Sequence, residues 1–408
     1  MRCGLLGQRL GHSYSPQIHS LLTDYAYDLF EIDPTQLEFF LKTEEFHGIN
    51  VTIPYKKAVI PFLDELSPVA QKLGAVNTIV RRPDGSLMGH NTDYFGFQSM
   101  VQQSGLNPKG KKVLVLGSGG ASNTAVAVME ALGAKPVVIS RSGENHYGNL
   151  QLHADAAIIV NTTPVGMYPD TGLSPIDLDL FPQLEGVLDV VYNPARTQLL
   201  LDAHNRGLIT MNGLWMLVAQ AKESAEWFTG KPISDENIGA IHHQLRLQMK
   251  NIILIGMPGC GKSTIGQILS QKTGRTCVDA DTVIATKAGM SIPEIFEKSG
   301  EDAFRRLETQ VLAELGKQSG LIIATGGGCV TRPENYPLLH QNGTIIWLKR
   351  DINQLPTAGR PLSQGTNLEE MFRIRRPLYT EFADFSVEND GVPEDITDRI
   401  LNILEEQS

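Results

Sequence analysis

The chain has 408 residues, enough for two or three domains that each bury their own core. Its composition, 41% hydrophobic and 20% charged, is ordinary for a globular protein, and its net charge of −10 argues against general binding to nucleic acid or to an anionic membrane. The four cysteines form no CxxC pair, and no apolar run reaches membrane-spanning length. We therefore expect a cytoplasmic protein with reduced thiols.

The first segment combines a short strand with a turn that contains two serines. Residues 3–6 are predicted as a strand, and the sequence Gly11-His-Ser-Tyr-Ser-Pro16 leads into a helix with apolar residues at 18, 21 and 22. Ser15, followed by Pro16, is typical of a helix N-cap. Such a hydroxyl can still donate its own proton to a ligand carboxylate. For Ser13 the sequence indicates no structural role.

Two further segments bring polar residues to the ends of predicted strands. The sequence GINVTIPYK, residues 48–56, runs a strand into a helix expected from Tyr55 to Leu66, with Lys56 in its first turn. The helix macrodipole disfavours a cation there, so Lys56 is either a surface lysine or a proton donor. Asn77 opens a hairpin turned by residues 83–85, and the return strand leads to Asp93, which could be only a helix cap.

Between residues 111 and 142 the pattern predicts a β-α-β unit of the dinucleotide-binding kind. Apolar strands at 113–116 and 136–139 flank a helix that opens at Gly117-Ser118-Gly119-Gly120-Ala121. An NAD site has an acidic residue at the end of the second strand, whereas this chain has Ser140 and Arg141. NADP is therefore favoured. Strands at 157–160 and 187–191 and a helix over 214–228 follow.

A phosphate-binding loop begins the second half. A strand from Asn251 leads into GMPGCGKS, residues 256–263, and a helix follows. The glycines let backbone N–H groups turn toward phosphate oxygens, Lys262 supplies charge, and the Ser263 hydroxyl can bind Mg²⁺. Such a loop stands at the start of its fold, so the roughly 250 residues before it indicate a separate protein fused to this one. The residues predicted to contact ATP are Gly259, Cys260, Gly261, Lys262, Ser263 and Thr264.

The remaining motifs of this half carry charged residues and glycines. Asp279 follows a strand beside the loop and is placed to hold the water shell of magnesium, with a turn as the alternative. Arg305 and Glu308 are three apart on a predicted helix, where a surface ion pair is the simplest interpretation. The triple glycine 326–328 permits close approach to a ligand. Residues 351–368 form a flexible-looking segment around Arg360.

Residues 1–248 resemble the shikimate dehydrogenase family, because HSYSP, NVTIPYK, GAVNT, NTD, GSGGAS, VYNP and NGLWMLVAQ all appear in family order. The resemblance implies an α/β substrate domain over 1–105, completed by helices of about 214–248, and a Rossmann NADP-binding domain over 106–213. It implies Lys56 and Asp93 as the catalytic pair. The implied substrate-binding residues are Ser13, Ser15, Thr52, Asn77, Asp93, Tyr192 and Gln220.

The same resemblance implies the cofactor side. The implied NADP residues are Gly117, Ser118, Gly119, Gly120, Ala121, Ser140, Arg141, Thr162 and Gly213. Family members often carry a second basic residue and a full helix after the position of Arg141. Here residues 143–151 are few and carry only Glu144 as a charged residue, so we expect a less strict preference for NADP.

Residues 250–408 resemble shikimate kinase over their whole length. The specific motifs are Asp279-x-Asp281, Phe304-Arg305-x-x-Glu308, the triple glycine, Arg360-Pro-Leu362 and Arg375-x-Pro-Leu-Tyr379. The resemblance implies a P-loop kinase domain of the nucleoside-monophosphate-kinase-like kind, with a parallel sheet and a lid at about 351–368. A further ATP-contacting arginine that some members place before the lid has no clear counterpart here.

Position by position, this second resemblance assigns roles to the kinase residues. Asp281 would bind the substrate hydroxyl and accept its proton, and Gly327 would touch the ring. Arg305 and Arg375 would clamp the carboxylate, a task suited to planar guanidinium groups. Lys262 and the lid residue Arg360 would act on ATP, while Ser263 and Asp279 would hold the metal.

The two resemblances predict a bifunctional α/β enzyme that acts on small molecules, with no nucleic-acid or membrane partner. It would reduce 3-dehydroshikimate to shikimate with NADPH and phosphorylate shikimate with ATP and Mg²⁺ to shikimate 3-phosphate. One alternative keeps the fold but changes the substrates, to quinate for the dehydrogenase and to another small molecule for the kinase. The other is a ligand-sensing module with one inactive site.

Overall fold

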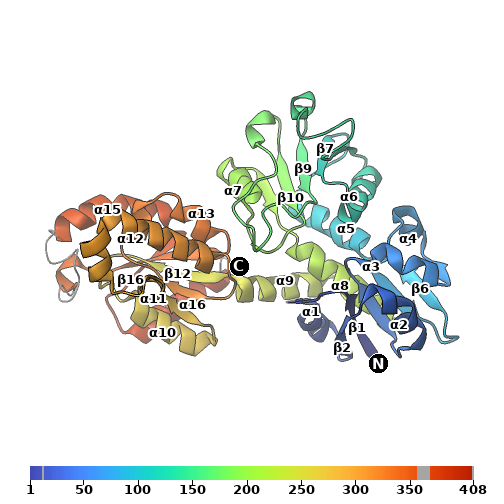
Figure 1. Cartoon of the computed structure of the whole chain (residues 1–408), viewed down its shortest axis with the longest axis horizontal. Helices are drawn as coiled ribbons and strands as arrows, with labels where there is room; N and C mark the ends of the chain where they lie inside the picture. Colours follow the sequence, from blue (N-terminus) through green and yellow to red (C-terminus); the bar gives the residue numbers. More distant parts are fainter. Residues whose placement is uncertain (12, 356–367, 407–408) are drawn as a thin grey trace. The chain divides into compact units, whose positions relative to one another are not determined.

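A computed structural model describes residues 1–11, 13–355 and 368–406 of the chain (Figure 1). The chain divides into two compact units, each built from segments that are not continuous in sequence. Unit 1 comprises Met1–Val165, Pro175–Tyr192 and Asp202–Gln244. Unit 2 comprises Gly166–Ser174, Asn193–Leu201 and Leu245–Ser408. The domain boundaries proposed from the sequence, near residues 105, 213 and 250, stay predictions.

The first sheet of unit 1 mixes parallel and antiparallel pairs. Its strand β1 is parallel to both neighbours, β2 and β3, while the hairpin β5–β6 continues the sheet in antiparallel register. The residues of β1 and β3 are almost all buried, which fits strands covered on both faces. In spatial order the strands are β2 (Ala26–Glu31), β1 (Arg2–Gly7), β3 (Gly48–Val51), β5 (Thr78–Arg81), β6 (Leu87–His90) and β4 (Glu65–Leu66). The helices of this part are α1 (Ser15–Leu22), η1 (Pro34–Gln36), α2 (Leu37–Thr43), α3 (Tyr55–Ala58), η2 (Ile60–Phe62), α4 (Pro68–Leu73) and α5 (Asp93–Ser104).

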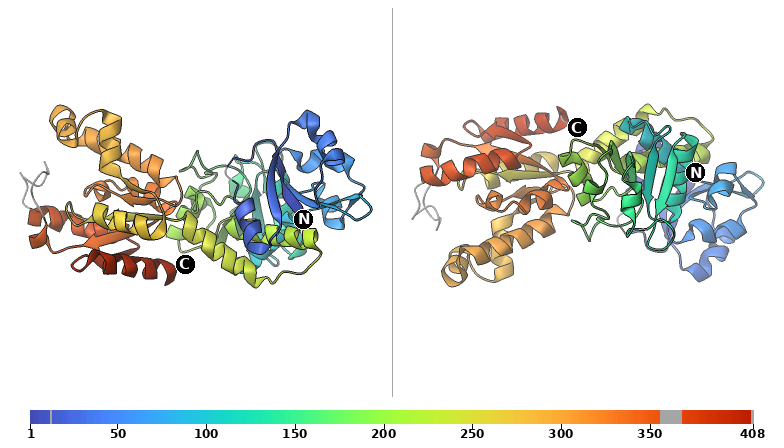
Figure 2. Two further views of the ribbon diagram at one scale, coloured as in Figure 1. Left: turned by 90° about the horizontal axis from the view of Figure 1, so that it is seen from below. Right: turned by 90° about the horizontal axis from the view of Figure 1, so that it is seen from above.

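The second sheet of unit 1 is fully parallel and contains the predicted β-α-β unit. After β8 the chain crosses to the other side of β7 to form β9, so the strand order reverses between β7 and β9. Ligands of open α/β sheets bind at the carboxyl ends of strands at such a reversal. In Figure 2 these strands, teal to green, lie side by side. In spatial order they are β11 (Ile209–Met211), β10 (Gly186–Asp189), β9 (Ile158–Asn161), β7 (Lys112–Leu116) and β8 (Lys135–Ile139). The helices that follow α5 are α6 (Gly120–Ala131), η3 (Leu150–His153), η4 (Leu178–Leu180), α7 (Gln198–Asn205), α8 (Leu214–Thr229) and α9 (Glu236–Met249).

The sheet of unit 2 is also parallel, and its order reverses at β12, between β14 and β15. Helices α12, α13 and α15 lie on one side of it, and α10 and α16 on the other (Figure 1). In spatial order its strands are β13 (Cys277–Asp279), β14 (Ile322–Ala324), β12 (Asn251–Ile255), β15 (Gly343–Lys349) and β16 (Phe385–Glu388). Its helices are α10 (Lys262–Thr273), α11 (Ala280–Ala288), α12 (Ile292–Gly316), η5 (Cys329–Thr331), α13 (Asn335–His340), η6 (Ile352–Gln354), α15 (Leu368–Phe382) and α16 (Pro393–Glu406).

These three sheets confirm the predicted α/β fold class. In the described part of the chain, each helix is too short or too polar to cross a membrane. The four cysteines are all free thiols, and three of them are buried.

One long helix predicted in unit 1 is wrong. The segment predicted as a helix from Tyr55 to Leu66 forms α3, η2 and the short strand β4 instead. Pro61 explains the difference, because proline lacks a backbone N–H and its ring clashes with the preceding helical turn. Lys56 consequently lies on a single helical turn directly after β3.

Candidate active sites

An ion pair joins the two residues predicted to act as the catalytic pair of unit 1. Lys56 comes from α3 and Asp93 is the first residue of α5, after β6. Lys56 Nζ lies 2.6 Å from Asp93 Oδ2, and the two side chains are 31% and 16% exposed. Thr92, not Asp93, is the N-cap of α5, so the interpretation of Asp93 as only a helix cap is wrong. The carboxylate is therefore available to hold the ammonium group.

A buried hydrogen-bond network places two further predicted residues beside this pair. Asn77 Oδ1 accepts the backbone N–H of Thr92 at 2.7 Å, and Asn77 Nδ2 donates to Thr92 Oγ1 at 3.0 Å. Thr92 Oγ1 in turn donates to Gln220 Oε1 on α8 at 3.4 Å. Asn77 and Gln220 thus flank the start of α5, where Asp93 follows Thr92.

The two serines lie in the turn that enters α1. The side chain of Ser13, and not that of Ser15, accepts a backbone N–H there. Ser15 is the first residue of α1, and its backbone N–H donates to Ser13 Oγ at 3.2 Å. The prediction of Ser15 as the capping side chain is therefore wrong. Tyr192 lies beside this turn, because its ring meets the Tyr14 ring edge-on at 6.2 Å between centroids.

Thr52 lies at the end of β3, next to the end of β1. Its backbone N–H donates to Leu6 O at 2.9 Å. A Cβ on Gly7 would stand 2.8 Å from Thr52 Cγ2, so only glycine allows this approach. The structure thus brings Thr52 to the edge of the sheet from which the chain continues toward the two serines.

The predicted cofactor residues of unit 1 gather at the strand-order reversal. Thr162 Oγ1 donates to Leu116 O at 2.6 Å, and Gly117, with φ of +107°, leaves room for it: a Cβ there would lie 2.9 Å from Thr162 Oγ1. Gly119 is the N-cap of α6 and offers no side chain to the first N–H groups of that helix. Such a helix start suits the pyrophosphate of a dinucleotide. Ser118, Gly120 and Ala121 belong to the same turn.

Two other cofactor predictions lie at neighbouring strand ends. Gly213 is the N-cap of α8, and a Cβ on it would stand 2.0 Å from Val190 O. Ser140 and Arg141 directly follow β8, and Arg141 is exposed. No carboxylate of the described residues pairs with Arg141, so its guanidinium group can meet a phosphate. This donor set fits NADP.

Unit 2 holds a cavity of about 760 Å³ in front of the phosphate-binding loop. It joins residues from segments that lie up to about a hundred positions apart in the sequence. The predicted residues that line it are Gly259, Gly261, Lys262, Ser263, Thr264, Asp279, Asp281, Arg305, Gly327 and Arg375. Arg360, and with it the centre of the predicted lid, lies outside the described residues.

The loop itself has the conformation that phosphate binding requires. Gly259 and Gly261 have φ of +85° and +98°, which only glycine adopts easily. Lys262 Nζ donates to Gly256 O at 2.9 Å and to Met257 O at 3.1 Å, across the mouth of the loop. Cys260, also predicted to contact ATP, is fully buried and is not among the residues that line the cavity; its backbone N–H donates to Met257 O.

The two predicted metal ligands are already in contact. Ser263 Oγ donates to Asp279 Oδ2 at 2.6 Å. The other oxygen, Asp279 Oδ1, accepts the backbone N–H groups of Asp281 and Thr282 at 3.0 and 3.3 Å and so caps α11. A hydroxyl and a carboxylate are hard oxygen ligands, and this pair fits Mg²⁺.

Arg305 and Glu308 form a buried pair rather than the surface pair that their spacing suggested. Arg305 Nη1 lies 2.7 Å from Glu308 Oε2, with side chains 6% and 0% exposed. Burial raises the pKa of Glu308, although Arg305 opposes that shift. The surface interpretation is therefore wrong.

The triple glycine lets the backbone pass against these charged groups. A Cβ on Gly326 would stand 2.5 Å from Glu308 Oε1, and one on Gly328 would stand 2.1 Å from Arg305 Nη2. Gly327 O accepts Arg375 Nη1 at 3.2 Å and also the Tyr379 hydroxyl. The Arg375-x-Pro-Leu-Tyr379 motif thus anchors the glycine loop from α15.

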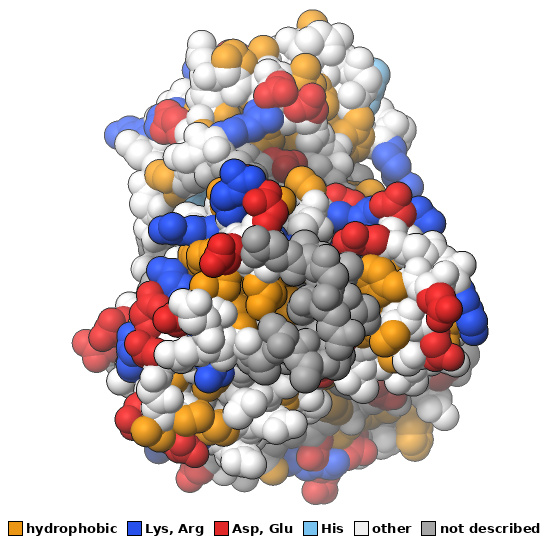
Figure 3. Space-filling view, turned by 90° about the vertical axis from the view of Figure 1, so that its left-hand side faces the viewer, with side chains coloured by type: hydrophobic (Ala, Val, Ile, Leu, Met, Phe, Trp, Pro, Cys, Tyr) orange, Lys and Arg blue, Asp and Glu red, His pale blue; other side chains and the backbone are white. Residues whose placement is uncertain are grey.

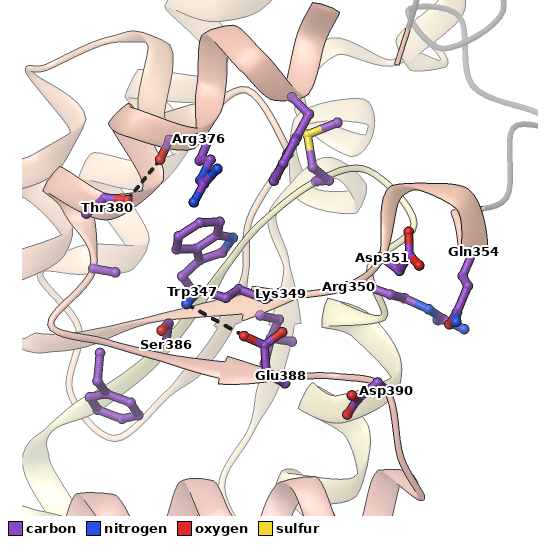
Figure 4. A pocket seen from close by; sticks show the side chains of 15 residues that line it. Trp347, Lys349, Arg350, Asp351, Gln354, Arg376, Thr380, Ser386, Glu388 and Asp390 are labelled. Carbon is purple, nitrogen blue, oxygen red and sulfur yellow. Dashed lines mark hydrogen bonds and ion pairs between the residues drawn. The ribbon is translucent and has the colours of Figure 1, made fainter. Parts of the chain in front are cut away.

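Arg350 is a candidate site residue that the sequence reasoning missed. It follows β15, lines the cavity at the phosphate-binding loop, and also lines a smaller cavity of about 140 Å³ with Thr264 and Pro393. Its buried Nε atom has no partner among the described residues. Figure 4 shows it with Gln354 at one end of a further cavity of about 690 Å³. Its position in the sequence could have indicated this role, because Arg350 directly follows the strand next to β12, where the sheet order reverses.

The cavity at the phosphate-binding loop is lined by charged residues of both signs, four cations and the three carboxylates of Asp279, Asp281 and Glu308. On the face drawn in Figure 3, acidic and basic side chains are interspersed. The four cations of the cavity lining are Lys262, Arg305, Arg350 and Arg375. An acidic chain can therefore bind anionic ligands there.

Comparisons with known proteins match both halves of the chain. Residues 5–79 match the family model of the shikimate dehydrogenase substrate binding domain, and residues 258–405 match that of shikimate kinase. A shikimate dehydrogenase (NADP(+)) of Clostridium perfringens (strain 13 / Type A) is 36% identical over 265 residues, which cover 60% of this chain and 97% of that protein.

Solved structures resemble the same part of the chain. Shikimate dehydrogenase 1 from Peptoclostridium difficile has 37% sequence identity and a TM-score of 0.55, covering 60% of this chain and 98% of that one. Shikimate 5-dehydrogenase from Thermus thermophilus, in complex with NADP(H) and shikimate, has 30% identity and a TM-score of 0.54, covering 60% and 99%.

Proposed function

We propose a function from one premise: the chain belongs to the shikimate dehydrogenase family, and its residues 258–405 form a shikimate kinase domain. Both resemblances found in the sequence are thereby confirmed. The chain is a bifunctional enzyme of the shikimate pathway. It reduces 3-dehydroshikimate to shikimate with NADPH, and it phosphorylates shikimate with ATP to shikimate 3-phosphate.

In the dehydrogenase, Lys56 and Asp93 carry the proton transfer. NADPH, when bound, supplies the hydride for the carbonyl carbon of 3-dehydroshikimate. Lys56 Nζ donates a proton to the carbonyl oxygen as negative charge grows on it, and Asp93, 2.6 Å away, holds the ammonium group in place. The carbonyl becomes the hydroxyl of shikimate.

The remaining dehydrogenase residues hold the substrate and the cofactor. Ser13 and Ser15 bind the substrate carboxylate, which the turn before α1 supports. The groups proposed to contact the ring hydroxyls are Thr52, Asn77, Tyr192 and Gln220. The glycine turn and the start of α6 receive the pyrophosphate of NADP, beside Thr162 and Gly213. Arg141 and Ser140 receive its 2′-phosphate.

The assignment of Arg141 predicts a change in cofactor preference. Arg141→Ala should lower the ratio of kcat/KM for NADPH to that for NADH by about tenfold or more, because it removes a charge-assisted bond to the 2′-phosphate alone. Lys135→Ala, an exposed lysine at the other end of β8, is the matched control and should leave the ratio unchanged. An unchanged ratio in Arg141→Ala would remove this residue from cofactor selection.

In the kinase, residues that line a single cavity bind both reactants. Lys262 and the loop N–H groups bind the phosphates, with Arg350 as a further nucleotide contact; Arg360, for which the family resemblance implies an ATP contact, lies outside the described residues. Ser263 and Asp279 would hold Mg²⁺, which, when bound, neutralises phosphate charge. Arg305 and Arg375 clamp the carboxylate of shikimate beside Gly327. Asp281 then accepts the proton of the reacting hydroxyl.

The observation that best supports the kinase function is that groups for both reactants line the same cavity. One cavity combines a phosphate-binding loop with two guanidinium groups suited to a carboxylate. Asp279 and Asp281 line the same cavity. A small acid with a hydroxyl group is the substrate that such a cavity would phosphorylate. All substrates proposed are small molecules. The four free thiols support a cytoplasmic location.

A comparison of two acids tests this function against the quinate alternative. Initial rates of NADP⁺ reduction and of ADP formation are measured with shikimate and with quinate at several concentrations. We expect kcat/KM for shikimate to exceed that for quinate by at least about tenfold in both assays. A preference for quinate in the first assay, or no ADP formation with shikimate in the second, would contradict the proposal.

A further inference from the structure

The guanidinium group of Arg305 is held by two carboxylates of its own helix, α12. Glu308 accepts from Nη1, as the FRxxE motif suggests. The second carboxylate was not predicted: Glu301 Oε1 accepts from both Nε and Nη2, at 3.3 and 3.1 Å. Arg305 is thus bound along one whole edge by a residue outside the FRxxE motif.

This arrangement fixes the plane of the guanidinium group. A guanidinium group has five N–H donors in a rigid fork. Glu301 takes Nε and one N–H of Nη2, and Glu308 takes one N–H of Nη1. One N–H of Nη2 and one of Nη1 remain for another acceptor, such as the carboxylate of a substrate.

The cavities show on which side each partner lies. Arg305 lines the cavity at the phosphate-binding loop and also a second cavity, of about 790 Å³, whose walls include residues 299–302 and 331–334. Glu301 lines the second cavity and not the first, whereas Glu308 lines the first. Glu301 therefore holds Arg305 from the side that faces away from ATP and leaves the first cavity open to the substrate.

Burial explains why the second partner matters. The Arg305 side chain is 6% exposed, so unpaired donors on it would be costly, while the Glu301 side chain is 54% exposed and reaches the fork from the surface. The backbone at Gly328 packs against the same guanidinium group and limits its other positions. Without Glu301, Arg305 Nε would have no acceptor among its described contacts, and the guanidinium group could rotate away from its orientation.

We propose that Glu301 is a positioning residue for the kinase reaction: it sets the orientation in which Arg305 presents its two remaining donors to the carboxylate of the substrate. This inference rests on the proposed function, in which Arg305 binds that carboxylate. It assigns to Glu301 an effect on substrate binding and none on phosphoryl transfer.

Kinase assays of the full chain test the inference. Glu301→Ala should raise KM for shikimate about tenfold while kcat and KM for ATP change less than about twofold. Glu301→Gln keeps an oxygen acceptor for Nε and Nη2 and should recover most of the loss. Asp302→Ala is the matched control: Asp302 is the next residue, lines the same second cavity and is 89% exposed, and its loss should change KM less than about twofold.

A neutral substrate analogue separates positioning from general charge. The methyl ester of shikimate keeps the ring hydroxyls but lacks the negative charge, so Glu301→Ala should not change its KM. An unchanged or lowered KM for shikimate in Glu301→Ala, or an equal rise for the ester or in Asp302→Ala, would overturn the inference. Arg305→Lys distinguishes the premise: if it leaves KM for shikimate unchanged, the proposed carboxylate clamp fails, and the role of Glu301 fails with it.

Discussion

Lys56→Ala lowers kcat for the reduction of 3-dehydroshikimate by about a hundredfold to ten-thousandfold, the usual contribution of a positioned general acid. KM changes little, because the proton is delivered chiefly in the transition state. Asp93 loses its partner at 2.6 Å, but its side chain is 16% exposed and can still be reached by water, so the fold of unit 1 should persist. The measurement is steady-state oxidation of NADPH, with phosphorylation of shikimate by the same preparation as the internal reference.

The neighbouring residue supplies the control for this result. Lys57 is exposed, lies on the same helical turn and forms no ion pair with a described residue. Lys57→Ala should retain the wild-type rate of reduction. A Lys56→Ala enzyme with near-full turnover would exclude Lys56 from the mechanism.

Lys262→Ala has the complementary effect. It lowers kcat for phosphorylation by about a hundredfold to a thousandfold, a loss typical for removal of one group that stabilises transition-state charge. Lys262 Nζ donates to Gly256 O and Met257 O, across the mouth of the loop. The substitution removes this positive charge from beside the phosphates, and water in its place would not restore the charge. Reduction of 3-dehydroshikimate should proceed at the wild-type rate.

A lysine at the far end of the same helix is the matched control. Lys272 lies in the last turn of α10 and pairs with Asp398 at 2.6 Å. Lys272→Ala removes the same charge from the same helix and should leave phosphorylation within about twofold of wild type, since a surface ion pair contributes little. If Lys262→Ala phosphorylates shikimate at more than about a tenth of the wild-type rate, the assignment of the loop is wrong.

Local sequence patterns were sufficient to predict the strand, loop and helix that are proposed to bind the phosphates. The apolar strand before GMPGCGKS, the glycines of the loop and the helix after it are properties of neighbouring residues, and the structure has them as expected. The capping box of Ser291 and Glu294 is likewise formed by residues three apart in the sequence. Pro61 is a counterexample, since its effect on the predicted helix could have been recognised from the sequence.

Burial of charged pairs could not be predicted in this way. The spacing of Arg305 and Glu308 is the same for an exposed and a buried pair. What buries them is the glycine loop 326–328, about twenty residues further along the chain, which packs directly on both side chains. Only the three-dimensional structure brings that loop to α12.

Long-range contacts set the same limit on the sites. Lys56 and Asp93 are 37 residues apart, and only the family resemblance paired them before the structure placed β3, β5 and β6 side by side. Arg350 belongs to no motif, and its position in the cavity depends on the order of the strands. Glu301 resembles any exposed helical glutamate until its contact with Arg305 is seen.

The central claim is that one chain carries out both reactions in sequence. The most direct test supplies the purified chain with 3-dehydroshikimate, NADPH, ATP and Mg²⁺ and follows NADPH, ADP and both acids over time. We predict that shikimate 3-phosphate accumulates, with one NADPH oxidised and one ADP formed for each molecule of product. Consumption of NADPH without ADP formation, or of neither cofactor, would contradict the claim.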